Sequence, residues 1–103
     1  MENNVKILSA GADKIVVGLA GDVDASVHEQ FDSVIQDCYL GNKADIILEC
    51  EELDFIDSTI LGAIVKLYKQ LKADGHRLVI KDLKPRIKKL FEICALDNVL
   101  EFA

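Results

Sequence analysis

Short apolar runs alternate along this chain with longer segments in which apolar residues recur every three or four positions. The short runs have the length of strands, and the spacing in the longer segments is that of helices with one apolar face. Strands that alternate with helices form mostly parallel sheets, because each helix connects two parallel strands. We therefore predict an α/β fold: a single small domain with a mixed, mostly parallel sheet of four to five strands and amphipathic helices.

The strands can be placed from the apolar runs. Residues 4–9 and 14–21 predict two strands joined by a Gly/Asp turn, as in a hairpin. The continuous apolar centre of residues 44–50 predicts a strand that is buried on both faces. Residues 77–83 predict a further strand, and residues 98–102 predict a short edge strand or an extended tail.

Two of the predicted helices start directly after a strand. The first follows residues 21–26, where Asp24 or Ser26 can cap it. The second covers residues 58–74, and Gly75 is typical of the position that ends a helix.

A third helix is expected to start at Pro85, since proline suits the first turn of a helix. Its apolar residues share one face that we expect to be buried: Ile87, Leu90, Phe91 and Cys94.

Composition restricts the partners and the compartment. The chain has 12 basic and 18 acidic residues and a net charge of −6, which argues against direct binding of nucleic acid or an anionic membrane. We find no signal-peptide core and no apolar run near the roughly 20 residues that span a bilayer. Cys38, Cys50 and Cys94 form no CxxC pair, and each falls at an apolar position of its segment. We expect buried free thiols in a cytoplasmic protein without a metal site.

Two strand-to-helix junctions are rich in short polar residues: residues 21–26 (GDVDAS) and 54–59 (DFIDST). In parallel sheets, functional sites gather where strands end and helices begin. We therefore expect these two junctions to lie side by side and to form the functional surface.

Three consecutive residues at the second junction, Asp57, Ser58 and Thr59, are all preferred helix caps, although one cap is enough. Helical spacing places Ser58 toward the polar side, within reach of solvent. A helix N-terminus tolerates an anion, so a phosphate on Ser58 would disturb the fold little. It would add about −1.5 to −2 charges that a partner would have to bury. Phosphorylation could thus end binding and leave the domain folded.

The chain resembles the anti-sigma factor antagonists of the STAS domain family in residues 21–26 (GDVDAS), 53–75 (LDFIDSTILGAIVKLYKQLKADG) and 84–102 (KPRIKKLFEICALDNVLEF). The family usually shows G-E-[LIV]-D at the first junction and D-S-[ST]-G-L-G at the second. The resemblance runs along nearly the whole chain in the right order, and it implies that residues 1–103 form one STAS domain.

In that family the serine after the aspartate is phosphorylated by an anti-sigma factor that is also a serine kinase. The unphosphorylated antagonist binds this kinase and frees the sigma factor, and a serine phosphatase restores binding after phosphorylation. The resemblance therefore implies a protein without catalytic activity or cofactor, with Ser58 as the phosphorylation site. The positions that match the partner-binding surface are Asp22, Asp24, Asp57, Thr59, Leu61 and Gly62.

The chain departs from the family at Ile60, where glycine is usual. An isoleucine there could obstruct the approach of a kinase. Helical spacing, however, puts Ile60 on the core-facing side with Ile64 and Leu71. A STAS scaffold or regulatory module that is never phosphorylated therefore stays open as an alternative.

An aspartyl-phosphate receiver domain is a further alternative, with Asp57 as the acceptor. Asp22 and Asp24 would then hold Mg²⁺, and Lys81 or Lys84 would contact the phosphoryl group. The order of the motifs argues against it, because receivers place the acidic pair after the first strand and are longer by a helix. A hydrolase is also disfavoured, since the chain has no G-x-S-x-G elbow. His28 falls in a polar part of its helix and His76 in a turn, so we expect both at the surface.

Overall fold

The computed structural model describes residues 4–103. Its main sheet has five strands in the order β1-β2-β4-β6-β7. β1 (Val5–Ala10) pairs antiparallel with β2 (Lys14–Leu19), which confirms the predicted hairpin. β4 (Asp45–Glu49), β6 (Leu78–Lys81) and β7 (Glu101–Phe102) continue the sheet with parallel pairing. The sheet is therefore mixed and mostly parallel, as predicted, and β7 is its short edge strand.

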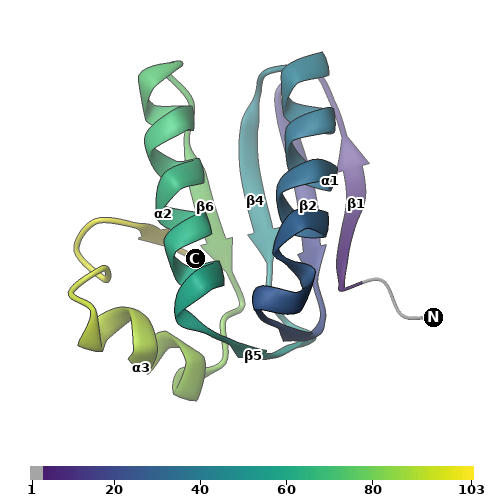
Figure 1. The fold of residues 1–103 in the computed structure, drawn as a ribbon. Helices are drawn as coiled ribbons and strands as arrows, with labels where there is room; N and C mark the ends of the chain where they lie inside the picture. The colour runs from purple at the N-terminus through teal and green to yellow at the C-terminus, as the bar shows by residue number, and fades with distance from the viewer. Residues whose placement is uncertain (1–3) are drawn as a thin grey trace.

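The helices lie on one face and at one end of this sheet (Figure 1). α1 (His28–Gly41) follows a short 3-10 turn, η1 (Ala25–Val27), which Asp24 caps. α2 (Ser58–Ala73) runs beside α1 on the same face, and α3 (Pro85–Ile93) packs near the start of α2. Within residues 4–103, no helix combines the length and the apolar character that crossing a bilayer requires.

The predicted end of α2 is confirmed. Gly75 adopts a positive φ of 81°, and the N–H of His76 donates to the carbonyl of Leu71 at 2.8 Å. This geometry closes the last turn of a helix, and glycine reaches it without strain from a side chain.

The core lies between the helices and the sheet face that they cover. Alternate residues of β2, β4 and β6 face this core, and the apolar sides of α1 and α2 pack against them. Burying each large apolar side chain contributes about 1.5–3 kcal/mol relative to leaving it exposed. The largest fully buried side chains are Tyr39, Phe31, Phe91, Ile15, Leu19, Ile35, Ile46, Leu48, Leu53, Ile56, Ile60 and Ile64.

The prediction that the strand at 44–50 is buried on both faces is wrong. Ile46 and Leu48 are fully buried, whereas Ile47 between them is only half-buried. The cause is the two-layer arrangement, in which both long helices cover the same face of the sheet (Figure 1). Ile47 pairs with Val16 and Val79 on the open face, and neighbouring side chains shield it in part.

The burial expected for α3 and for the cysteines is confirmed only in part. Ile87 and Phe91 are buried, but Leu90 is 37 % exposed. Cys94 is also exposed, because α3 ends at Ile93 and contacts the rest of the domain along a narrow side. Only Cys50 is buried among the thiols, and burial raises its pKa to about 12, while Cys38 is half-buried.

Candidate functional site

The two polar junctions lie side by side, as predicted. β3 (Gly21–Val23) and β5 (Leu53–Ile56) form a separate two-stranded parallel sheet in which Val23 pairs with Ile56. Parallel pairing brings the carboxyl ends of both strands to one edge, so the two following loops meet there.

Asp57 joins these two loops and also starts α2. Its Oδ2 accepts a hydrogen bond from the backbone N–H of Ala25 at 2.9 Å. Its Oδ1 accepts one from the backbone N–H of Ile60 at 3.1 Å, which makes Asp57 the N-cap of the helix. One carboxylate therefore fixes the relative position of both junctions.

Ser58 and Thr59 are the first two residues of α2, and both are exposed. Because Asp57 provides the cap, the Ser58 hydroxyl is not needed to start the helix. A helix of 16 residues begins here, so its unpaired N–H groups and its dipole favour negative charge beside Ser58. The hydroxyl is thus open to solvent at a position that accommodates a phosphate.

The next three residues separate into inward and outward positions. Ile60 is fully buried (0 % exposed), and Leu61 is nearly so at 9 %. Gly62 is exposed, and a Cβ built on it would meet no atom within 4 Å. Ile60 therefore does not cover Ser58, and Gly62, one helical turn further, leaves open space beside it.

The two acidic residues of the first junction differ in their surroundings. Asp24 accepts hydrogen bonds from the hydroxyl and the backbone N–H of Ser26, at 2.5 and 3.0 Å. These bonds, the hydroxyl's first, hold the pKa of Asp24 below its usual range. Asp22 is exposed on β3, where it pairs with Phe55 of β5. Asp24 thus shapes the loop, whereas Asp22 faces solvent.

β5 also carries two residues of the second junction that are not among the predicted partner-binding positions. Phe55 is 47 % exposed. Asp54 accepts a hydrogen bond from Lys84 at 2.6 Å and lies 3.9 Å from Arg86. Lys84 first, and Arg86 less, hold the pKa of Asp54 below its usual range. The alternation rule places Asp54 and Phe55 on opposite faces of a strand, so no pattern in the sequence predicts that both are exposed.

Among residues 4–103, the acidic groups near α2 do not form a cluster with the spacing of metal ligands. The one cluster with that spacing consists of Glu49, Glu51 and Asp82. Asp57, the acceptor in a receiver domain, already receives two backbone N–H bonds. The geometry therefore disfavours the receiver interpretation and presents a solvent-facing hydroxyl instead.

The structure is thus a small α/β domain with an exposed serine at the head of a capped helix, beside a second polar junction. The family model described as "STAS domain" matches residues 6–103. The chain belongs to the STAS domain family.

Curated relatives agree with this assignment over nearly their full length. The chain is 27 % identical over 101 residues to an anti-sigma-B factor antagonist of Listeria monocytogenes, which covers 98 % of this chain and 89 % of the relative. It is 29 % identical over 98 residues to an anti-sigma-B factor antagonist of Staphylococcus aureus, covering 94 % and 91 %. The resemblance to anti-sigma factor antagonists is confirmed.

Solved structures share the fold. The Bacillus cell fate determinant SpoIIAA in its phosphorylated form superposes with a TM-score of 0.76 at 24 % identity, covering 96 % of this chain and 90 % of that chain. An anti-sigma-factor antagonist (STAS) domain protein from Planctomyces limnophilus gives a TM-score of 0.83 at 16 % identity, covering 95 % and 87 %. The predicted fold class is therefore confirmed.

Proposed function

We propose that this protein is an anti-sigma factor antagonist that binds an anti-sigma factor serine kinase and is released when Ser58 is phosphorylated. The binding surface is the exposed side of Asp22, Ser58, Thr59 and Gly62, which we call the Ser58 surface. Asp24, Asp57 and Leu61, the other residues of the predicted partner site, hold this surface in place through their hydrogen bonds and packing. A serine phosphatase would reverse the modification, and all three proteins would act in the cytoplasm.

The observation that carries this proposal is the division of roles between Asp57 and Ser58. Asp57 makes the cap hydrogen bonds, and Ser58 directly after it is exposed. A kinase can therefore reach the hydroxyl without unwinding the first turn of α2. The buried position of Ile60 also supports access, because its side chain points away from the surface that the kinase must cover.

The charges around Ser58 support release on phosphorylation. A phosphate adds about −1.5 to −2 charges at pH 7. Asp22 is exposed at the first junction, and Lys84 and Arg86, the bases that contact β5, both already contact Asp54. A partner that covers the phosphoserine would have to bury this charge without neutralising it, which costs several kcal/mol. Since 1.4 kcal/mol is about tenfold in affinity, such a cost is enough to end binding.

Binding measurements with the kinase of the same organism test the proposal. Wild type and Ser58→Ala should bind with the same affinity, whereas Ser58→Asp should bind at least about tenfold more weakly because it adds a buried negative charge. Ser33→Asp adds the same charge at an exposed position of α1 and should bind like wild type. Equal affinity of Ser58→Asp and wild type would contradict the proposed switch and favour a STAS scaffold without phosphorylation.

A further inference from the structure

Exposed large apolar side chains occur on β5 and α3: Phe55 and Leu90 line one cavity, and Ile93 lies one helical turn beyond Leu90. Phe55 on β5 is 47 % exposed, and Leu90 and Ile93 on α3 are 37 % and 76 % exposed. Leu90 and Ile93 are three positions apart, so they lie on one side of α3. Folding stability does not require this exposure, and contiguous exposed apolar surface marks interaction sites.

A small cavity separates the two elements of this area. It measures about 150 Å³ and is lined by Asp54, Phe55, Ile56, Arg86, Ile87 and Leu90. Small-molecule sites usually measure roughly 300–1,000 Å³. The cavity is therefore too small for a typical metabolite, and a single apolar side chain of a protein partner fits it better.

The cavity is lined by one acidic and one basic residue, Asp54 and Arg86, and further basic residues stand beside it at the start of α3, although the whole chain has a net charge of −6. Lys84, Arg86, Lys88 and Lys89 follow one another within six positions at the start of α3. Lys84 and Arg86 both contact Asp54, and Arg86 also donates to the Asp54 carbonyl at 2.9 Å. The Arg86 side chain is nevertheless 68 % exposed, and Lys89 is exposed. Two bases contact this one carboxylate, so positive charge remains in excess here and complements a partner segment that carries acidic residues.

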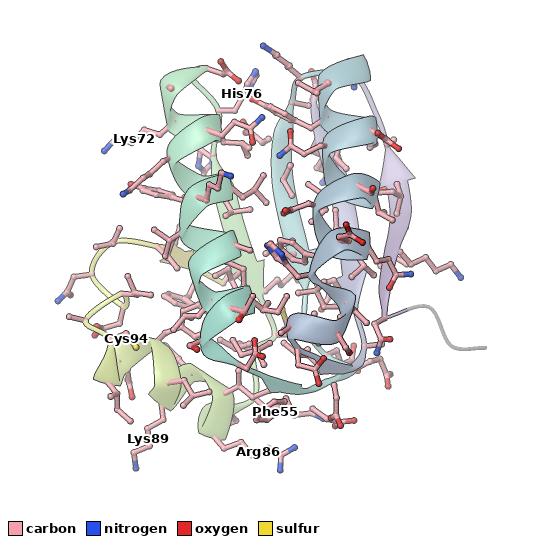
Figure 2. The ribbon with its side chains drawn as sticks, in the orientation of Figure 1. Phe55, Lys72, His76, Arg86, Lys89 and Cys94 are labelled. Carbon is pink, nitrogen blue, oxygen red and sulfur yellow. The ribbon has the colours of Figure 1, made fainter. Side chains whose placement is uncertain are left out.

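The part of this area on β5 is adjacent in sequence to the Ser58 surface. β5 ends at Ile56 and leads through Asp57 directly into Ser58. Figure 2 shows Phe55, Arg86 and Lys89 at the same end of the molecule, opposite the end with Lys72 and His76. A protein that covers Ser58 can therefore extend over α3.

We propose that the β5–α3 patch, formed by Phe55, Arg86, Lys89, Leu90 and Ile93, binds an acidic segment of the same protein that covers Ser58. One apolar side chain of this segment enters the cavity between Phe55 and Leu90, and its carboxylates face Arg86 and Lys89. The identity of this partner as the kinase rests on the proposed function, whereas the chemistry of the patch does not.

Affinity for the kinase, measured with single variants of the full chain, tests the proposal. Ile93→Asp and Lys89→Glu should each bind at least tenfold more weakly, because both place negative charge opposite the acidic segment. Leu40→Asp is the matched control, since Leu40 is a 62 % exposed leucine at the far end of α1. It should bind like wild type, and circular dichroism melting should show all three variants folded.

The outcomes separate this proposal from the proposed function. If Ser58→Asp loses binding while Ile93→Asp and Lys89→Glu bind like wild type, the patch proposal is wrong and the switch stands. If the two patch variants lose binding and Ser58→Asp does not, the switch is wrong and the patch stands. Equal losses in Leu40→Asp would overturn the assignment of the patch. Sedimentation of the protein with phosphatidylserine vesicles, lost in Lys89→Glu, would overturn it in favour of a membrane.

Discussion

The carboxylate of Asp57 accepts a hydrogen bond from the backbone N–H of Ala25 at 2.9 Å, although the two residues are 32 positions apart. The same side chain caps α2 through the N–H of Ile60. Asp57 therefore couples the loop after β3 to the first turn of the helix that carries Ser58. Asp57 is therefore the group that connects the two halves of the Ser58 surface.

Replacing Asp57 should lower stability measurably. Loss of an N-cap costs about 0.5–2 kcal/mol, and the lost bond to Ala25 adds about 0.5–1.5 kcal/mol. We expect Asp57→Ala to lower the free energy of unfolding by about 1–3 kcal/mol in urea titrations, and Asp57→Asn to lower it less, since asparagine is also a good cap. Asp22→Ala removes an exposed carboxylate of the same junction and should change stability by less than about 0.5 kcal/mol. An unchanged Asp57→Ala would show that the cap is dispensable.

Ile60 should matter for folding and not for access to Ser58. Its side chain is fully buried, so Ile60→Ala should cost about 2–5 kcal/mol in the free energy of unfolding. Ile60→Val should cost only about 0.5–1.5 kcal/mol. Initial rates of Ser58 phosphorylation, measured where each variant is folded, should equal that of wild type. A faster rate in either variant would mean that Ile60 obstructs the kinase.

Gly62 allows stability and docking to be tested apart. Alanine is about 1 kcal/mol more favourable than glycine inside a helix, and a Cβ at Gly62 meets no atom within 4 Å. Gly62→Ala should therefore raise the free energy of unfolding by about 0.5–1 kcal/mol. Gly62→Gln should be similarly stable, yet its long side chain stands on the Ser58 surface and should slow phosphorylation at least tenfold. Wild-type phosphorylation of Gly62→Gln would exclude this part of α2 from the contact.

Glu49 should make stability depend on pH. Its Oε1 is buried without a hydrogen-bond partner among residues 4–103, and the carboxylates of Glu51 and Asp82 lie within 4.8 Å. Burial first, and then Asp82 through a hydrogen bond between the two side chains and through its charge, raise the pKa of Glu49, although Lys81 at 3.8 Å opposes the shift. The folded protein thus binds a proton more tightly than the unfolded chain, and the carboxylate lowers stability once it is charged.

The effect can be isolated with Glu49→Gln. At pH 7 this variant should be more stable than wild type in urea titrations, because an amide removes the buried charge. The difference should shrink as the pH falls through the raised pKa, and it should vanish below the ordinary value of 4.5, where Glu49 is protonated in both states. Glu92→Gln, at an exposed position of α3 outside this cluster, is the control. A Glu49→Gln variant that is less stable than wild type at pH 7 would assign the larger effect to Lys81.

Much of the fold follows from the spacing of apolar residues. The buried positions of α2, such as Ile60, Ile64 and Leu71, recur at helical spacing and are found where the spacing places them. The meeting of the two polar junctions was also predictable, because parallel strands bring their carboxyl ends to one edge. Such patterns report which side of an element faces apolar neighbours.

Other features depend on how many faces of a strand or helix are covered by other elements, and the sequence of that strand or helix does not encode this. Ile47 lies in an apolar run, yet both helices pack on the opposite face of the sheet. Leu90 and Cys94 share the apolar side of α3, but only part of that side is in contact with the domain. The bond from the backbone N–H of Ala25 to Asp57 joins loops that are 32 positions apart, so no local rule predicts it.

The most direct test of the central claim is a phosphate map by mass spectrometry after incubation with the organism's anti-sigma factor kinase and ATP. We expect one phosphate on Ser58 in wild type and in Thr59→Ala, and none in Ser58→Ala. Phosphate that persists in Ser58→Ala, or that maps to another residue of wild type, would contradict the account.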